Sequence, residues 1–346
     1  GGVGLRFETG TPTSITERMR IASDGKVGIG QTDPEAVMDI VGNSDSVPAL
    51  KIGPNNSFGF KFFDRSTEGD LLIKREVSGT DYDVLRFSRS DGSVFPPTSA
   101  TNNLRLGSGA GAAIASGGNY NTLIGDSAGG AITTGYQNVA VGYQALDAED
   151  TGGRSVAVGM QALSAQNNDA ANYNVGVGYQ AGTAITTGQY NTFIGGAAGD
   201  ATTTGPKNTA VGYNSLGANT TGDFNNAFGF QALLTSTTGN NNAAFGGNAL
   251  GLLTTGTNNV AMGRNALYAN TTASNNTAIG HQAGTAVTTG TLNTLVGSLA
   301  GDALTDGEAN VAIGYGALGA EDQADANVAI GVNTLANQNA GTSESY

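Results

Sequence analysis

The stretch Asn138-Val139-Ala140-Val141-Gly142 decides the fold of this chain, because close variants of it return at a fixed interval. Asn121-Thr122-Leu123-Ile124-Gly125 lies 17 residues before it, and Asn276-Thr277-Ala278-Ile279-Gly280 repeats the pattern further along. Each variant ends in a glycine, and neighbouring repeat glycines are 17 residues apart, except that Gly178 follows Gly159 after 19. Such regular spacing predicts a repeat protein in which every copy forms one structural unit. The repeat glycines are Gly125, Gly142, Gly159, Gly178, Gly195, Gly212, Gly229, Gly246, Gly263, Gly280, Gly297, Gly314 and Gly331.

Each position within a copy carries a characteristic residue type, and we number positions from the repeat glycine, which is position 0. Position −4 is Asn in every copy except the one with Ser155, and an atypical first copy around Gly107 brings the number of copies to fourteen. Position −1 is nearly always Val, Ile, Phe or Met, and Thr or Val predominates at position −3. This alternation predicts a short strand with one apolar, β-branched face. Ala is typical at +3, Leu or Gly at +4 and a second Gly at +10, and we expect both glycines to form tight corners with positive φ.

A repeat of 17 residues is too short for two helices per copy, so the chain is predicted to be all-β. A solenoid coil with two short strands and two turns fits this length, and neighbouring coils then stack about 4.8 Å apart. About fourteen coils give a rod of roughly 60 Å. We expect the Asn side chains at −4 to form a ladder along the rod that satisfies their hydrogen bonds away from water. The two extra residues after Gly159 fall within Ser164–Asn172, where we expect an outward loop.

The charged residues divide the chain into two parts. Residues 104–346 hold only 4 Lys or Arg and 14 Asp or Glu, whereas the first 103 residues hold 11 and 14. Two prolines, at positions 96 and 97, end any strand at the boundary between these parts. We therefore predict a small β domain at 1–97, a linker at 98–102 and the repeat shaft at 103–346.

The first part contains a clear hairpin pattern. Residues 18–21 and 26–29 alternate polar and apolar side chains around Asp24-Gly25, which favours a tight primed turn. Further alternating runs between residues 58 and 87 predict a small antiparallel meander. Pro34–Ile40 is the one candidate helix in this part.

Composition excludes several classes of function. The chain has no Cys and a single His, so zinc fingers, iron–sulfur sites and thiol nucleophiles are excluded, and we expect neither a metal nor a cofactor. A net charge of −13 argues against binding nucleic acid through its phosphates. No apolar run reaches the roughly 18 residues of a membrane-spanning helix, so we expect no membrane insertion. The first residues, Gly1-Gly2-Val3-Gly4, include neither an initiator Met nor a signal peptide, which predicts a processed or truncated start.

The repeat resembles two known kinds of extracellular fibre. Copies such as Asn310-Val311-Ala312-Ile313-Gly314 resemble the head repeats of trimeric autotransporter adhesins, although the unit is longer here. The fuller unit, as in residues 138–146, is similar to bacteriophage tail-fibre repeats, and so is the leading segment 17–30. Together the resemblances cover residues 17–42 and about 103–335. They imply a left-handed parallel β-roll, three parallel copies of the chain and a place in the tail fibre of a virion.

Tyrosines are the candidate ligand-binding residues. Four of them directly follow a repeat glycine, at position +1: Tyr143, Tyr179, Tyr213 and Tyr315. Exposed Tyr rows stack on sugar rings, but they also cover packing seams between chains, and we favour the seam. His281 occupies the same position without a Ser or Asp partner pattern, so we interpret it as a variant of the Tyr position.

Acidic turns offer the only candidate catalytic groups. Asp147, Glu149 and Asp150 cluster in one copy, and Glu321, Asp322 and Asp325 cluster in another. Two carboxylates suffice for sugar hydrolysis and several can hold a cation. We favour a solvated acidic turn that keeps the rod soluble.

The sequence Gly28-Ile29-Gly30 lacks the third Gly and the Lys of a phosphate loop.

The sequence therefore predicts a structural, receptor-binding protein without catalytic residues: a segment of a homotrimeric tail fibre. Its expected partners are two further copies of itself, other tail or fibre proteins, and a glycan or protein of a host cell surface. Three identical chains hold weak sites at fixed spacing, so avidity exceeds the affinity of one site. The first alternative is a bacterial surface adhesin or extracellular filament. A second, less favoured alternative is a tailspike-type glycan hydrolase that uses the acidic turns.

Overall fold

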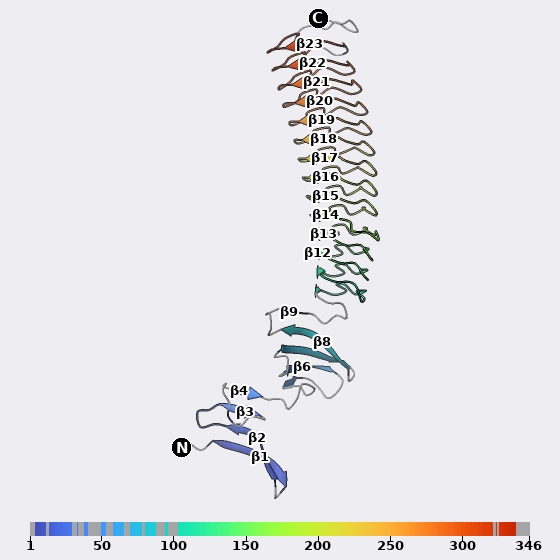
Figure 1. Cartoon of the computed structure of the whole chain (residues 1–346). Helices are drawn as coiled ribbons and strands as arrows, with labels where there is room; N and C mark the ends of the chain where they lie inside the picture. The colour runs from blue at the N-terminus through green and yellow to red at the C-terminus, as the bar shows by residue number, and fades with distance from the viewer. Residues whose placement is uncertain are drawn as a thin grey trace. The chain divides into compact units, whose positions relative to one another are not determined.

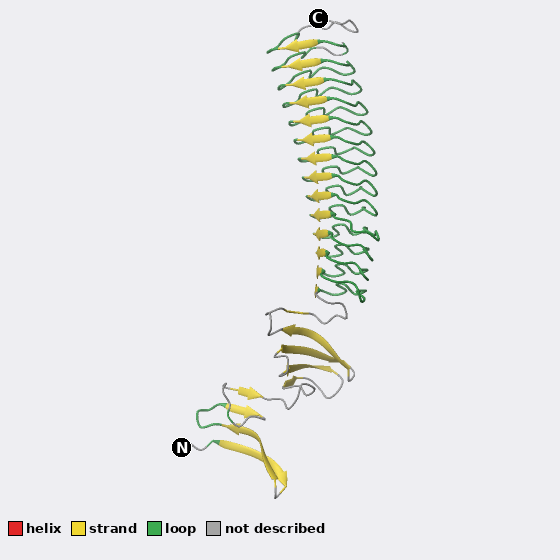
Figure 2. Cartoon of the chain, viewed as in Figure 1, coloured by secondary structure: helices red, strands yellow, loops and turns green. Residues whose placement is uncertain are grey.

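The computed structural model describes residues 4–11, 14–29, 33, 38–40, 50–52, 58–65, 70–77, 80–87, 94–95, 103–320, 323 and 325–336. The chain divides into two units, Gly1–Ser99 and Ala100–Tyr346. Strands, turns and loops account for all described residues, and none of these residues is helical (Figure 2). The all-β prediction is confirmed. The predicted linker at 98–102 lies outside the described residues.

The first unit contains a four-stranded sheet and a five-stranded sheet (Figure 1). In the four-stranded sheet, β1 and β2 are antiparallel, β2 and β3 are antiparallel, and β3 and β4 are parallel. The five-stranded sheet is an antiparallel meander in chain order, as predicted. The strands are β1 Leu5–Thr11, β2 Ser14–Ile21, β3 Val27–Ile29, β4 Met38–Ile40, β5 Leu50–Ile52, β6 Phe58–Arg65, β7 Asp70–Val77, β8 Thr80–Phe87 and β9 Val94–Phe95.

The predicted hairpin is present as β2 and β3, but its turn differs from the expected one. Gly25 has φ of 86°, whereas Asp24 does not have a positive φ. The Gly25 amide donates to the Ala22 carbonyl at 3.0 Å, and the Ala22 amide donates to the Lys26 carbonyl at 2.7 Å. This is a three-residue loop with a left-handed glycine at its end, and it needs one positive φ instead of two. The candidate helix over 34–40 is wrong at its end, because Met38–Ile40 is strand β4, and residues 34–37 are not described.

The second unit is a parallel β-solenoid of fourteen strands, stacked in chain order (Figure 1). Every strand pairs in register with the next one along the chain, residue 0 of one coil lying beside residue 0 of the next. The predicted solenoid of 17-residue coils is confirmed. Its strands are β10 Leu104–Leu106, β11 Thr122–Ile124, β12 Val139–Val141, β13 Val156–Val158, β14 Val175–Val177, β15 Thr192–Ile194, β16 Thr209–Val211, β17 Asn226–Phe228, β18 Ala243–Phe245, β19 Val260–Met262, β20 Thr277–Ile279, β21 Thr294–Val296, β22 Val311–Ile313 and β23 Val328–Ile330.

Each described coil has one three-residue strand, not the two strands that were predicted. The rest of the coil turns through left-handed backbone at positions +2, +4 and −5. In the coil of Gly212, for example, Asn214 has φ of 52°, Leu216 of 55° and Lys207 of 59°. Left-handed residues break the extended backbone that a second strand requires, so the return path of the coil is a series of turns.

The interior of the solenoid is an apolar core made of positions −2, +3 and +4, and position +7 adds an apolar residue in some coils and a buried polar one in others. Residue sizes at −2 and +4 are complementary. Most coils have Ala at −2 and Leu at +4, as in Ala244 and Leu250, both fully buried. Where −2 is large, +4 is Gly. A Cβ on Gly199 would lie 2.7 Å from the Phe193 ring, and a Cβ on Gly182 of the preceding coil would lie 2.8 Å from it. One large side chain therefore fills the interior of two coils.

The apolar, β-branched face of the strands points out of the coil. In β12, Ala140 at −2 is fully buried, whereas Val139 and Val141 at −3 and −1 are only partly buried. Several −1 residues are markedly exposed: Ile194, Phe245, Met262, Ile279 and Ile313 have 38–42% of their surface accessible. In a single chain the small residue between them fills the interior, and positions −3 and −1 form an outer face.

Candidate functional site

The Asn residues at −4 form the predicted ladder, and each one connects two coils. Asn191 Oδ1 accepts the backbone N–H of Asn208 in the next coil at 2.9 Å. Asn191 Nδ2 donates to the Gly205 carbonyl of its own coil at 3.0 Å. These asparagines are buried, so the ladder supplies the hydrogen bonds that water cannot. Most hydrogen bonds of the ladder run from side chain to backbone, so they hold the backbone of every coil in the same shape.

The repeat glycines are required by backbone geometry. Gly212 has φ of 134°, and a Cβ built on it would lie 2.4 Å from the carbonyl oxygen of Gly229 in the next coil. The second glycines of the coils, at +10, differ from the prediction. Gly205 does not have a left-handed φ, but its Cβ would lie 2.3 Å from the Gly222 carbonyl oxygen. Close approach of neighbouring coils, not dihedral angle, favours glycine at +10.

The four candidate tyrosines lie on the surface at +1. Tyr143, Tyr179, Tyr213 and Tyr315 are 47–58% exposed. The first three lie within five coils, but they do not form an unbroken row, because Met160 and Gly196 occupy the coils between them. Tyr315 lies six coils beyond Tyr213, so the structure does not bring it together with the others.

Ring stacking within this row uses some of the aromatic surface. Tyr213 stacks on Phe230 of the next coil with centroids 5.8 Å apart and 18° between the rings. Tyr143 and Tyr179 have no ring partner among the described residues. Tyr179 is followed by Gly196, and a Cβ there would meet only the Tyr213 ring, at 3.5 Å. Both tyrosines therefore keep ring surface exposed.

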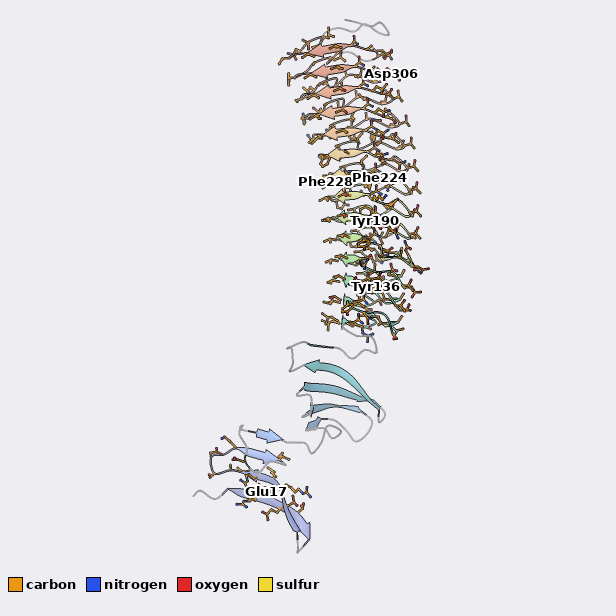
Figure 3. All side chains as sticks on the ribbon, in the orientation of Figure 1. Glu17, Tyr136, Tyr190, Phe224, Phe228 and Asp306 are labelled. Carbon is orange, nitrogen blue, oxygen red and sulfur yellow. The ribbon has the colours of Figure 1, made fainter. Side chains whose placement is uncertain are left out.

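A second exposed aromatic row, at −5, was missed by sequence reasoning. Tyr173 and Tyr190 stack with centroids 5.5 Å apart and 9° between the rings (Figure 3 labels Tyr190). The Arg154 guanidinium lies 5.4 Å from the Tyr173 ring centroid, and the Lys207 amine lies 4.6 Å from that of Phe224. The signal was present in the sequence, because each of these residues directly precedes the −4 position. The residue type at position −5 varies between copies, so the repeat pattern does not reveal this row.

The acidic turn around Glu149 is not solvated, which corrects our interpretation of it. Glu149 is fully buried. Its Oε2 accepts from Gln166 Nε2 at 2.7 Å and from Asn172 Nδ2 at 2.9 Å, and its Oε1 accepts the Gly152 amide at 2.8 Å. Removal from water raises the pKa of this carboxyl. Asp147 and Asp150 are partly exposed. The turn thus contains one inaccessible carboxyl rather than an open pair.

The hydrogen bonds around Glu149 explain why the following coil, that of Gly159, alone has Ser at −4 and two extra residues. Ser155 cannot reach across the coil as an Asn does. Gln166 does so instead, because its Nε2 donates to Ser155 Oγ at 2.9 Å and its Oε1 accepts from Asn174 Nδ2 at 2.9 Å. The extra length is exposed at Asn167, Asp169 and Ala170, while the neighbouring strands β13 and β14 stay in register. The predicted outward loop is present, but it is anchored by a buried glutamine.

Three aspartates at position +5 have a pKa that is raised by burial, as the pKa of Glu149 is. Burial raises the pKa of Asp147, Asp200 and Asp302, and the nearby Asp126 raises that of Asp147 further. No ion pair is formed by the residues described between 103 and 336. Of the second acidic cluster, Glu321 and Asp322 are not described. Asp325 is exposed and accepts the Glu308 amide at 2.7 Å.

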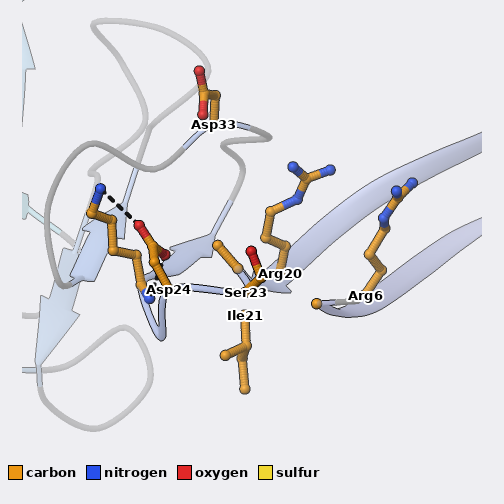
Figure 4. A pocket seen from close by; sticks show the side chains of 9 residues that line it. Arg6, Arg20, Ile21, Ser23, Asp24 and Asp33 are labelled. Atoms are coloured by element: carbon orange, nitrogen blue, oxygen red, sulfur yellow. Dashed lines mark hydrogen bonds and ion pairs between the residues drawn. The ribbon is translucent and has the colours of Figure 1, made fainter. Parts of the chain in front are cut away.

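The first unit contains a polar depression of about 350 Å³ beside the hairpin (Figure 4). Arg6, Arg20, Lys26, Asp24 and Asp33 line it. Arg20 forms an ion pair with Glu17 at 2.6 Å, and Lys26 forms one with Asp24 at 3.0 Å. These partners lower the pKa of Glu17 and of Asp24. The lining thus carries three cationic and two anionic side chains, and the cations Arg20 and Lys26 are already in ion pairs.

The described part of the chain lacks two further features. It contains no group of three or more His, Cys, Asp or Glu residues placed to hold a metal ion. It also contains no helix with the length and apolar character needed to cross a membrane. No protein-family model, no curated protein and no solved structure matches the chain.

Proposed function

We propose that this chain is a structural, receptor-binding segment of a homotrimeric bacteriophage tail fibre in the virion, without enzymatic activity. The observation that carries the proposal is the outer face of the solenoid, formed by positions −3 and −1 of strands β10 to β23. This face is uncharged and largely aliphatic or aromatic, with Thr at several −3 positions, and it stays partly exposed among the described residues. We infer that a partner covers it. The sequence resemblance to tail fibres and trimeric adhesins supplies the biological setting.

A second copy of the chain fits this face better than an unrelated partner. No charged residue occurs at −3 or −1 in any coil, although the chain carries a net charge of −13. An acidic chain approaches its own copy most readily along an uncharged surface, and interface centres are depleted of charge. Fourteen three-residue strands make a strip about 60 Å by 10 Å, or roughly 600 Å² per chain, close to the size of a stable interface.

Parallel association in a closed ring satisfies the periodicity. Coils of two parallel copies have the same spacing, so every coil meets an equivalent coil, and cyclic symmetry gives each chain the same interface. The resemblance favours three copies. Native mass measurement tests this, and we expect a species of three times 34.5 kDa. A well-folded monomer of 34.5 kDa would overturn the proposal.

A charge placed on the outer face makes the test specific. Val211 lies on that face at −1, whereas Thr204 is exposed on the return path of the preceding coil. Val211→Asp buries three unpaired carboxylates in the trimer and is expected to dissociate it. Thr204→Asp is the matched control, which adds the same charge and leaves the mass unchanged. Dissociation by both variants, or by neither, contradicts the outer face as the interface.

Receptor binding rests on the exposed aromatic residues at +1 and −5. Tyr143 and Tyr179 present open ring surface that suits sugar rings or a protein partner. Three chains repeat each weak site at fixed distances, which raises avidity. Binding of the labelled full chain to a panel of bacterial cells, before and after removal of surface polysaccharide, tests this role. Absence of binding to every strain counts against a receptor-binding segment and leaves a purely structural shaft.

Two alternatives remain distinct from this proposal. A bacterial surface adhesin or extracellular filament uses the same trimeric shaft, and the genes adjacent to the coding sequence separate it from a phage fibre. A glycan hydrolase is less favoured, because Glu149 is buried and hydrogen-bonded to three neutral donors. Release of reducing ends from host polysaccharide, lost on Asp150→Asn, would establish the hydrolase.

A further inference from the structure

The proposed trimer raises a question of register between chains. Because the coils repeat every 17 residues, sliding one chain past another by one coil, about 4.8 Å, brings nearly identical residues together again. Such a slip changes only the contacts at the two ends of the rod. A periodic interface specifies its register weakly unless some residue breaks the pattern. The register must therefore be set by an aperiodic feature of the outer face.

Asn226 is the one amide side chain on that face. It occupies −3 in strand β17, where the other coils have Val, Thr, Ala or Leu. It is exposed, and its side chain makes no hydrogen bond to any described residue. Its neighbours in the same row are Thr209 on one side and Ala243 on the other. Both donors and the acceptor of its amide are thus open to a partner chain.

The pattern of side-chain size on the outer face is also interrupted at strand β17. Phe228 shares strand β17 with Asn226, and Phe245 occupies the equivalent −1 position in the next coil (Figure 3 labels Phe228). The two rings stack with centroids 4.9 Å apart and 6° between them. They are the only aromatic residues at −1 in the fourteen coils. Polar and bulky exceptions to the repeat therefore coincide in two adjacent coils.

We propose that Asn226 fixes the register of the chains in the assembly. The inference rests on the proposed association of parallel copies. In register, the Asn226 side chains of the copies meet one another, and each amide both donates and accepts. After a slip of one coil, each amide faces Ala243 or Thr209 and leaves hydrogen-bonding groups unpaired in a buried apolar seam. A single polar residue in an apolar seam sets register in coiled coils by the same mechanism, at a cost in stability.

Cysteine cross-linking measures the register, because the natural chain has no Cys. Thr277 and Thr294 occupy −3 in adjacent coils, three and four coils after Asn226. Chains with Thr277→Cys and differently tagged chains with Thr294→Cys are unfolded together, refolded and oxidised. Disulfides need Cα atoms within about 7 Å, so links between equal positions report the in-register assembly and links between unequal positions report a one-coil slip.

The two kinds of link are then compared in three backgrounds. With Asn226 present we expect almost only links between equal positions. Asn226→Val is expected to raise the slipped links about tenfold or more, because the mismatch no longer costs a hydrogen bond. Thr209→Val is the matched control and should leave the ratio as it is. Thermal melting of each trimer shows whether Asn226→Val retains or raises stability, which separates loss of register from loss of folding.

Each outcome has a defined meaning. A trimer in which Asn226→Val keeps only equal-position links overturns the role of Asn226 while the association stands. Slipped links that are equally frequent in all three backgrounds also overturn it. A monomer by native mass, with no links of either kind, overturns the association itself and the register inference with it.

Discussion

The size complementarity inside the solenoid is open to a direct thermodynamic test. Phe193 is fully buried at −2, and a Cβ on Gly199 at +4 would lie 2.7 Å from its ring. Phe193→Ala removes the ring and should lower the free energy of unfolding by about 3–5 kcal/mol. Gly199→Leu alone should also destabilise, because the new side chain overlaps the ring. Its backbone is no obstacle, since Leu250 has φ of 51° in the same position and Gly199 has 57°.

Combining the two substitutions recreates the arrangement of Ala244 and Leu250, which lie three coils further along. The double variant should therefore be more stable than the sum of the single effects predicts, by about 2 kcal/mol or more. Denaturant unfolding of the four proteins, followed by circular dichroism, gives this coupling energy. Additive effects, or a double variant less stable than the sum, would refute the complementarity of the two positions.

Three further predictions concern single residues. Gly212→Val should lower the free energy of unfolding by about 1–3 kcal/mol, the cost of a strained backbone conformation. Gly196→Val should change the melting temperature little, because a Cβ at Gly196 would lie 3.5 Å from the nearest atom. Equal losses of stability in the two variants would contradict the role of φ at position 0. Deleting Asp169–Ala170 should be tolerated, because both residues are exposed. Gln166→Ala should lower the melting temperature, since it removes hydrogen-bond partners of Glu149 and of neighbouring amides. A larger loss of stability on the deletion than on Gln166→Ala would contradict the role of Gln166 as an anchor. Burial raises the pKa of Glu149, so its contribution to stability is greatest below the ordinary carboxyl pKa and is lost as pH rises through the folded value. Melting temperatures from pH 4 to 8 should fall less steeply for Glu149→Gln than for the natural chain, and equal slopes would contradict this contribution of the buried carboxyl.

The repeat made much of the fold predictable from sequence. Its constant spacing determined the coil length, the parallel register and the buried ladder of asparagines, because any residue at −4 must meet its equivalent in the next coil. The number of strands per coil was not predictable from alternation alone. Left-handed backbone at +2, +4 and −5 is carried by residues such as Leu216 and Phe224, which have no intrinsic preference for it.

Which face of the strand is internal was not predictable from the sequence either. Alternation shows that two faces differ, but not which one is internal. Val139 and Val141 are the larger apolar residues, so burial in a single chain would favour them, yet the coil is too narrow to enclose two β-branched residues per strand. Its interior accepts Ala140 with Leu146 instead. Glu149 was misjudged for a related reason, since its amide partners Gln166 and Asn172 come from the following coil and are distant in sequence.

The in-register stacking of the strands determines how the shaft responds to force. Strands lie across the rod, so the hydrogen bonds between neighbouring coils point along it. A pull on the two ends of one chain loads these bonds in series, coil after coil, whereas strands sheared lengthwise share the load. Each coil that opens releases 17 residues, which extend to about 58 Å in place of a rise of about 4.8 Å. Under tension a single solenoid therefore lengthens in equal steps of roughly 50 Å and dissipates work at each step, while the remaining coils keep their shape.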